Sequence, residues 1–447
     1  MTTTLSHLDA LESLITKAKA AGATAADAVM FDSTDISCSC RKGKPESVER
    51  AESTGLGLRV FMGQKIAIVS SSDTRDATLQ ELVDRAVAMA KESPEDPFAA
   101  LAAPEQLATH IPELDLFDGD EPSPEWLAET CKRTEEAALA IDGITNSEGA
   151  NAAYSANRIA LVTSNGFAQG YPTSSFMASV AVIAGKGDKM ERDYDYSVSR
   201  HREDLASPEA IGQKAAQNTL ARLNPRKAKS CKVPIVFDPK IAKGLIATFA
   251  GAISGASVAR GTTFLKDYLG KEVFAPGITI VDDPHIVRAL GSRPFDAEGV
   301  GNKRRNLVEN GVIQSWLLDI RTAKKLGLQT LGDAARGTAS PPMPSTSNLY
   351  LEPGSLSPEA LMADIKEGLY ITETFGSGSN LVTGDVSVGA AGFWIENGQK
   401  AYPVSEITIA GNLKDMYKNL IPASDLTFKY ATNAPTVRID GMTVAGT

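Results

Sequence analysis

Long hydrophobic runs are missing from this sequence of 447 residues. Residues 244–259 carry no charge, but they fall short of the roughly 20 apolar residues that a membrane-spanning helix needs. Residues 159–185 also carry no charge, but Asn165, Gln169 and Pro172 make this segment too polar to cross a bilayer. We therefore expect no membrane insertion, and we interpret residues 159–185 as two buried strands around a turn.

Cysteine is also scarce. Four cysteines, at positions 38, 40, 131 and 231, form no disulfide framework in a chain of this length. The single residue between Cys38 and Cys40 suits alternation along a strand better than a zinc or redox site, and this cysteine usage is typical of a reducing compartment. Asp9 and Glu12 interrupt any apolar segment near the N-terminus, so we expect no signal peptide and a cytoplasmic location.

Several motifs of known chemistry are absent. The sequence has no phosphate-binding G-x-x-x-x-G-K-[ST] loop, no dinucleotide-binding G-x-G-x-x-G and no G-x-S-x-G nucleophile turn. Its histidines stand far apart, at positions 7, 110, 201 and 285, so a histidine-based zinc site would have to be assembled from distant segments. The chain has 45 Lys and Arg against 55 Asp and Glu, and a net charge of −10 does not favour binding to nucleic acid.

The length predicts two or three domains, and the hydrophobic pattern predicts an α+β fold. In the first half we expect an α/β region in which helices cover an antiparallel or mixed sheet. The helices are expected from Leu5 to a stop at Gly22, after Asp73, at 123–140 and at 207–223. The strands are expected at 27–40, in a hairpin over 55–71 that turns at Gly63-Gln64, and at 144–155, 158–168 and 174–186. We place a β-rich domain at 229–447, after a first domain at 1–228 with a further boundary within 93–124. Asn310-Gly311 and Asn397-Gly398 are typical of hairpin turns.

Two segments are candidates for chemistry. Asp282-Asp283-Pro284-His285, with Asp296 and Glu298 a few residues on, could hold a divalent cation. We favour the alternative of an acidic turn after a strand, in which aspartates accept backbone N–H groups. The segment 244–261 is rich in Gly, Ala and Ser; we expect a helix there that lets another backbone approach or fills a cramped core, and it carries no ligand or base.

A family resemblance is carried by blocks that follow one another along most of the chain. The C-terminal half contains GLIATFAGAISGASVARGTTFLKDYLGKEV, TIVDDP, FDAEGVGNKRRNLVENGVIQSWLLDIRTAKKLG, SNLYLEPG and TGDVSVGAAGFWIENGQKAYPVSEITIAGNL. The N-terminal half contains ITNSEGA and TSNGF. On these blocks the chain resembles the TldD/PmbA family, whose members are called modulators of DNA gyrase. The resemblance implies an N-terminal α/β region and a C-terminal β-rich, barrel-like domain.

The resemblance implies a position for a zinc site. In the TldD branch of the family, a helix at this place carries His-Glu-x-x-x-His, and a distant cysteine completes a zinc peptidase site. Here Ile246, Ala247 and Gly251 stand at those positions, and Cys231 is the last cysteine of the chain. None of the three side chains can bind zinc, so the sequence resembles the PmbA branch, also called TldE. The resemblance implies that this chain binds no metal cofactor and that zinc belongs to a TldD-like partner.

The resemblance also implies a function. It suggests a non-catalytic subunit that pairs with a TldD-like catalytic subunit in a heterodimer, or forms a homodimer if isolated, and helps to enclose unfolded peptide substrates. As residues of a peptide groove or interface we expect Arg260, Asp282, Asp283, Gly384 and Gly389. Residues 376–395 are expected to border the groove, although a core hairpin with bulges explains their small residues equally well.

Two other functions remain open. One is an independent hydrolase that uses Asp282, Asp283, His285 or a serine. The other is a peptide-binding homodimer without turnover.

Overall fold

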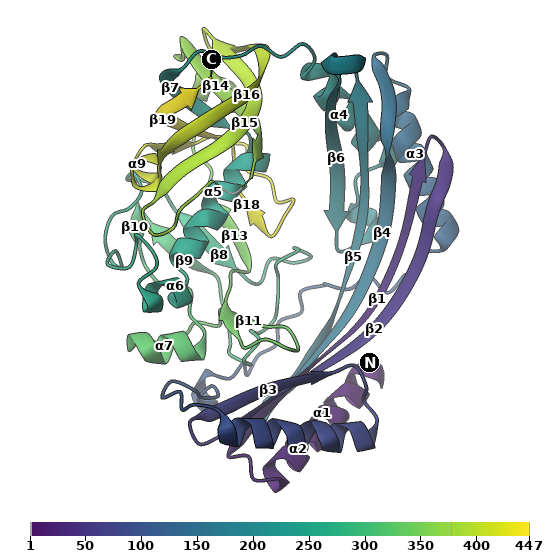
Figure 1. The fold of residues 1–447 in the computed structure, drawn as a ribbon, viewed down its shortest axis with the longest axis vertical. Coiled ribbons are helices and arrows are strands. Elements are labelled where there is room, and N and C mark those ends of the chain that lie inside the picture. Colours follow the sequence, from purple (N-terminus) through teal and green to yellow (C-terminus); the bar gives the residue numbers. More distant parts are fainter. Residues whose placement is uncertain (1, 377, 447) are drawn as a thin grey trace.

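The structure is a computed structural model that describes residues 2–376 and 378–446, the side chains of residues 2–6 excepted. A long curved sheet of N-terminal strands runs along one side of the molecule, and the C-terminal half stands beside it (Figure 1). The order of the sheet is β3-β2-β1-β4-β5-β6. Its strands are β1 (Ala25–Arg41), β2 (Lys44–Met62), β3 (Lys65–Ser71), β4 (Ile144–Thr163), β5 (Ala168–Ala184) and β6 (Glu191–Ser199).

Every pairing of this sheet is antiparallel among the described residues. Of the antiparallel or mixed sheet that we expected for the N-terminal half, the antiparallel alternative is present, because tight turns join β1 to β2, β2 to β3 and β4 to β5, and such turns allow only antiparallel neighbours. Parallel pairing occurs instead in the C-terminal half, between β7 and β14 and between β13 and β18. The α+β class is confirmed.

Four of the strands are unusually long. Strands β1, β2, β4 and β5 contain 17, 19, 20 and 17 residues, where about 5–6 is common. The two strands that we predicted at 144–155 and 158–168 are one strand, β4, because Ala156 and Asn157 pair with β1 on one side and β5 on the other, which leaves no room for a turn. At about 3.3 Å per residue, each long strand spans roughly 55–65 Å.

Each end of the long sheet has its own pair of helices and its own hydrophobic core. One core contains Leu11, Leu14 and Leu82 together with inward residues of β1, β2 and β4, and the other contains Leu127 and Phe176. The helices are α1 (Thr2–Ala20) and α2 (Asp76–Glu92) at the first core, and α3 (Pro124–Leu139) and α4 (Pro208–Ala221) at the second; single 3-10 turns lie at Pro104–Gln106, Gly187–Lys189 and Arg202–Asp204.

The predicted helix starts are confirmed at two helices and shifted at one. Ser123 and Ser207 accept a backbone N–H at the starts of α3 and α4, each followed by proline. The carboxylate of Asp73 does not cap α2, which begins at Asp76; it binds the N–H of Arg75 and the hydroxyl of Thr78. Asp73 therefore orders the turn before the helix.

The C-terminal half combines a closed barrel with a second sheet. Five strands form the barrel in the order β16-β15-β14-β7-β19, and pairing of β16 with β19 closes it. The second sheet has the order β10-β9-β8-β13-β18. The strands are β7 (Cys231–Phe237), β8 (Ile280–Asp283), β9 (Arg305–Glu309), β10 (Val312–Ile313), β11 (Ala334–Ala335), β12 (Met343–Pro344), β13 (Asn348–Leu351), β14 (Glu367–Phe375), β15 (Asp385–Glu396), β16 (Gln399–Asn412), β17 (Leu420–Pro422), β18 (Thr432–Asn433) and β19 (Val437–Ala445). The helices are α5 (Pro239–Ala252), α6 (Gly255–Arg260), α7 (Ile320–Leu326), α8 (Pro358–Met362) and α9 (Leu413–Lys418).

Both predicted hairpin turns are present. Asn310 and Gly311 have φ of 48° and 83° between β9 and β10, and Asn397 and Gly398 have φ of 48° and 78° between β15 and β16. Positive φ at both central residues matches the twist of the flanking strands. No helix within the described ranges is long and apolar enough to cross a membrane.

The small-residue segment 244–261 forms parts of two helices rather than the single helix that we expected. Helix α5 ends at Ala252, and Gly255 starts α6 with its N–H bonded to the carbonyl of Leu317. A Cβ on Gly255 would lie 2.9 Å from that carbonyl oxygen and 2.6 Å from Leu318. The other backbone that approaches the helix thus belongs to the chain itself, and this contact interrupts the helix.

Candidate functional site

Helix α5 lies in the middle of the C-terminal half (Figure 1). Residues at its start line one cavity, and later residues of the helix line another. Asp238 caps its start by accepting the N–H of Lys240, and Pro239 occupies the first helical position. One face of the helix, with Ile246 and Phe249, is fully buried in the main C-terminal core. The opposite face carries small side chains and is open.

The open face of α5 forms the floor of a groove with a volume of about 510 Å³. Ala247 and Gly251 line this groove, whereas Ile246 points into the core. The structure therefore brings two of the three zinc-motif positions to one cavity wall and leaves the third inside the protein. The lining residues are Phe237, Ile241, Gly244, Leu245, Ala247, Thr248, Gly251, Thr374, Gly376, Gly378, Ser379, Leu381, Val386, Val388, Ile409, Met416 and Met442.

The chemistry of the α5 groove does not fit zinc. Its described walls offer hydroxyl groups and thioether sulfurs, but no imidazole, thiolate or carboxylate. Zinc sites in proteins are built from those three ligand types. Across residues 2–376 and 378–446, no group of three or more His, Cys, Asp or Glu side chains is arranged to hold a metal ion. What the groove can do is accept apolar side chains and let a backbone approach closely.

The segment after β14 forms one wall of the α5 groove. Gly378, Leu381 and Val388 line the cavity, and Ser377 lies outside the described residues. Gly378 lies against β15, because a Cβ there would be 2.3 Å from the carbonyl oxygen of Ser387. Part of residues 376–395, the segment that we expected to border a groove, thus lines the α5 groove. Gly378 in this segment makes room for the chain's own backbone in β15.

The remaining predicted glycines lie near this wall without lining it. Gly384 occupies a turn with φ of 86°, and its carbonyl accepts the N–H of Leu413. Gly389 pairs with Phe375 across strands β15 and β14. Both glycines shape the hairpin that forms the wall.

Arg260, Asp282 and Asp283 are not brought to the α5 groove. Arg260 is exposed at the end of α6. Asp282 is buried in β8 and accepts the N–H and hydroxyl of Ser347; burial raises the pKa of Asp282, and the nearby Arg305 opposes the rise. Asp283 accepts the N–H of His285. These aspartates therefore hold turns and strand ends.

Asp296 and Glu298 belong to a different network from Asp282 and Asp283. The carboxylate of Asp296 accepts the backbone N–H groups of Glu298, Val300 and Ala334. Burial raises the pKa of Asp296 to about 6 and that of Glu298 to about 8. The acidic cluster seen in the sequence is thus divided between two places in the fold.

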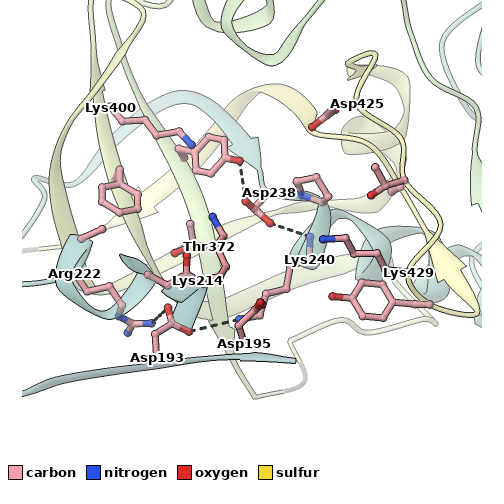
Figure 2. A pocket seen from close by; sticks show the side chains of 18 of the residues that line it. Asp193, Asp195, Lys214, Arg222, Asp238, Lys240, Thr372, Lys400, Asp425 and Lys429 are labelled. Atoms are coloured by element: carbon pink, nitrogen blue, oxygen red, sulfur yellow. Dashed lines mark hydrogen bonds and ion pairs between the residues drawn. The ribbon is translucent and has the colours of Figure 1, made fainter. Parts of the chain in front are cut away.

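A second cavity of about 520 Å³ lies on the other side of the start of α5, between the N-terminal and C-terminal halves (Figure 2). Asp193 on β6 pairs with Arg222 and with Lys240. The hydroxyl of Tyr370 donates to Asp238 at 2.8 Å, and the Nζ of Lys400 lies 3.2 Å from the centre of the Tyr370 ring. Burial lowers the pKa of Lys400.

Sequence reasoning missed this charged cavity. Its charged residues come from β6, α4, the start of α5, β16 and the loop after β17, and no local motif joins them. They are Asp193, Asp195, Lys214, Arg222, Asp238, Lys240, Lys400, Asp425 and Lys429. Since cations and anions are present in nearly equal number, the cavity suits polar main-chain groups better than a single strongly charged ligand.

Comparison with known proteins identifies the family. The descriptions PmbA/TldA metallopeptidase domain 1, central domain and C-terminal domain match residues 26–90, 117–223 and 230–446. The chain is 39% identical to metalloprotease PmbA of Escherichia coli O157:H7 over 425 residues, which cover 94% of this chain and 92% of that protein. The chain belongs to the PmbA/TldD family.

Solved structures show the same fold as this PmbA/TldD family member. A Bacteroides thetaiotaomicron protein, whose name refers to a modulator of DNA gyrase, superposes with a TM-score of 0.91 at 26% identity, covering 98% of both chains. TldE from Thermococcus kodakarensis superposes with a TM-score of 0.87 at 23% identity, covering 98% of this chain and 100% of that one. The long sheet and the barrel are thus shared features of the fold.

Proposed function

We propose that this chain is the non-catalytic subunit of a cytoplasmic zinc metallopeptidase of the TldD/TldE type. In this proposal a TldD-like partner carries the zinc, and the present chain binds unfolded peptides along the α5 groove. The observation that carries the proposal is the composition of that groove, where Ala247 and Gly251 stand on the floor and no zinc ligand lies on the described walls. Small side chains there leave room for a peptide, while catalysis needs ligands from elsewhere.

The shape of the groove supports binding of peptides with little regard to sequence. An extended peptide can be held by main-chain hydrogen bonds while its apolar side chains enter a hydrophobic groove. Leu245, Leu381 and Met416 offer apolar contact on different sides of the α5 groove, and Thr248 and Ser379 offer hydroxyl groups. The charged cavity at the start of α5 supplies a neighbouring polar surface.

The test compares the isolated chain with the chain co-expressed with its TldD-like partner. We expect no stoichiometric zinc and no peptidase activity in the isolated chain, and hydrolysis of unfolded peptides by the pair. Elemental analysis and a fluorogenic peptide assay measure both. One tightly bound zinc per isolated chain, together with peptide hydrolysis, would contradict the proposal.

A substitution in the groove tests whether the α5 face itself binds peptide. Ala247→Trp places a large ring on the groove floor, and we expect at least a tenfold loss of peptide affinity for the pair without loss of assembly. Ala77→Trp, on the exposed face of α2, is the matched control and should bind peptide normally. Equal peptide affinity in both variants would remove the groove from the proposal, even if the pairing itself is observed.

A further inference from the structure

Strand β2 is the outermost strand of the long sheet over residues 44–55 (Figure 1). Strand β3 pairs only with residues 56–62 of β2, so residues 44–55 have β1 on one side and, among the described residues, no strand on the other. Residues 48–53 are exposed, and they include the apolar side chain of Val48, which is 55% exposed. An unpaired edge of this length offers its main-chain groups to a further strand.

The alternation of hydrogen bonds along β2 shows which main-chain groups point outward. A two-residue turn makes Met62 and Lys65 a hydrogen-bonded pair, so even-numbered residues of β2 direct their N–H and C=O groups to the β3 side. On the opposite side, the carbonyl of Phe61 accepts the N–H of Thr24, just before β1. The register with β1 is continuous over residues 47–61, so the alternation holds there. The outward groups of the unpaired edge are those of Val48, Arg50, Glu52 and Thr54.

The unpaired edge of β2 is protected at its tip but not along residues 47–54. Lys44 and Pro45 stand at the tip, and a bulge interrupts the pairing with β1 between Ser39 and Cys40. Charges, prolines and bulges are the usual devices that prevent edge strands from pairing. Beyond the tip, the outward main-chain groups have no hydrogen-bond partner in the part of the chain that the structure describes. The edge is thus available to a strand whose side chains complement its charges.

We propose that residues 47–55 pair antiparallel with the same residues of a second copy of this chain, about a two-fold axis at Ala51. Arg50 of each copy then lies opposite Glu52 of the other, and main-chain hydrogen bonds join these pairs because both residues point outward. Within one chain Arg50 contacts Glu121 and the neighbouring Glu52, and the five N–H donors of its guanidinium allow a further contact across the axis. Opposite charges directly across two antiparallel strands stabilise their pairing.

The side chains favour this register over its alternatives. An axis at Glu49 would place glutamate opposite glutamate, and an axis at Arg50 would place arginine opposite arginine; like charges directly across two strands destabilise the pair. An axis at Val48 would extend the pairing into the protected tip. With the axis at Ala51, two small methyl groups meet where the strands approach most closely, and Val48 lies opposite Thr54. The edge is therefore self-complementary, as a two-fold interface between identical chains requires.

Two charge-reversal variants test the pairing in the isolated full chain. Association is measured by sedimentation velocity up to about 100 µM, because a small interface is expected to be weak. Arg50→Glu places acid opposite acid across the axis, and Glu52→Arg places base opposite base. We expect each variant to weaken the association at least about tenfold, so that wild type forms a species of twice the mass at concentrations where neither variant does. An equimolar mixture of the two variants should associate as wild type does, because each new charge then faces its opposite on the other chain.

The matched control is Glu81→Arg, which makes the same change of charge at an exposed position of α2, at the other end of the long sheet (Figure 1). It should change the Kd of association by less than about twofold. A wild type that does not associate, a charge-reversal variant that associates as tightly as wild type, or a mixture no heavier than its components would overturn the proposal. These measurements need neither a TldD-like partner nor a peptide, so their outcome is separate from that of the proposed function.

Discussion

Replacing Asp27 by asparagine tests the buried ion network that joins the long sheet to the C-terminal half. Asp27 on β1 is 1% exposed and accepts from Arg59 on the neighbouring strand and from Arg336 of the C-terminal half. The substitution would keep the size of the side chain but remove its negative charge. Among the described residues, Asp27 is the only carboxylate within hydrogen-bond distance of both guanidiniums. Arg59 has one further contact, with Glu298 at 3.5 Å. Removing one partner of a buried ion pair costs about 3–5 kcal/mol.

The loss should be visible in urea unfolding followed by tryptophan fluorescence. With a denaturant slope of about 3 kcal/mol per molar urea, a loss of about 4 kcal/mol lowers the midpoint by roughly 1 M. The control is Glu209→Gln, which breaks the exposed pair of Glu209 with Arg133 and should leave the midpoint nearly unchanged. A midpoint for Asp27→Asn equal to that of the control would refute the claim that this network holds the two halves together.

The pH dependence provides a second readout of the same variant. Burial alone would raise the pKa of Asp27, but Arg336 and Arg59 outweigh it and lower the pKa below 3.8. The ionised carboxylate therefore contributes stability above the pKa of the unfolded chain, and this contribution is lost as pH falls through the lower pKa of the folded chain. The gap in stability between wild type and Asp27→Asn should narrow as pH falls below about 4.

Three other parts of the molecule give further predictions. Because burial raises the pKa of Glu298 to about 8, the folded chain keeps a proton that the unfolded chain releases above about pH 4.5. Wild-type stability should therefore fall as pH rises from 5 to 8, by at most about 1.4 kcal/mol per pH unit. Glu298→Gln should flatten this pH dependence of stability, measured by urea titrations at each pH. An unchanged slope would contradict the burial argument. Gly57→Ala puts a Cβ 2.2 Å from the carbonyl oxygen of Thr338 and should lower the free energy of unfolding by about 1–3 kcal/mol. Gly244→Ala on α5 meets nothing within 4 Å and should raise the free energy of unfolding by about 0.5–1 kcal/mol in the same assay. Equal effects of the two substitutions would refute the contact of Gly57 with Thr338. Of the four free thiols, the partly buried Cys231 should react first with a thiol reagent and the three buried ones only after unfolding, so rapid labelling of more than one thiol in the native chain would be inconsistent with this packing.

Local features of the fold were predictable from the sequence because nearby residues decide them. Asn-Gly turns accept the positive φ that hairpins need, and Ser-Pro pairs cap and start helices. The stripe of buried residues on α2 is the one that helical spacing predicts: Leu79, Leu82, Val83, Ala86, Val87 and Ala90. In each case the chemical cause and its effect lie within one or two turns of chain.

Errors arose where a distant segment decided the local structure. The loop that we expected inside β4 is absent because β1 and β5 pair along its whole length, and the helix at 244–261 is interrupted because the backbone of Leu317 bonds to Gly255. Neither partner is near in sequence to the element that it changes. The acidic residues 282–298 look like one cluster in the sequence, yet the fold divides them between two networks.

The sequence by itself determined that no zinc ligand stands at 246, 247 or 251, since the identity of a side chain settles which donor atoms it has. Only the tertiary structure decided that Ala247 and Gly251 share a groove wall while Ile246 is buried, and that Arg59 and Arg336 meet Asp27 in one buried ion network. The physical reason is that donor chemistry belongs to single residues, whereas cavities and buried charge depend on which segments, up to 309 positions apart, the folded chain packs together.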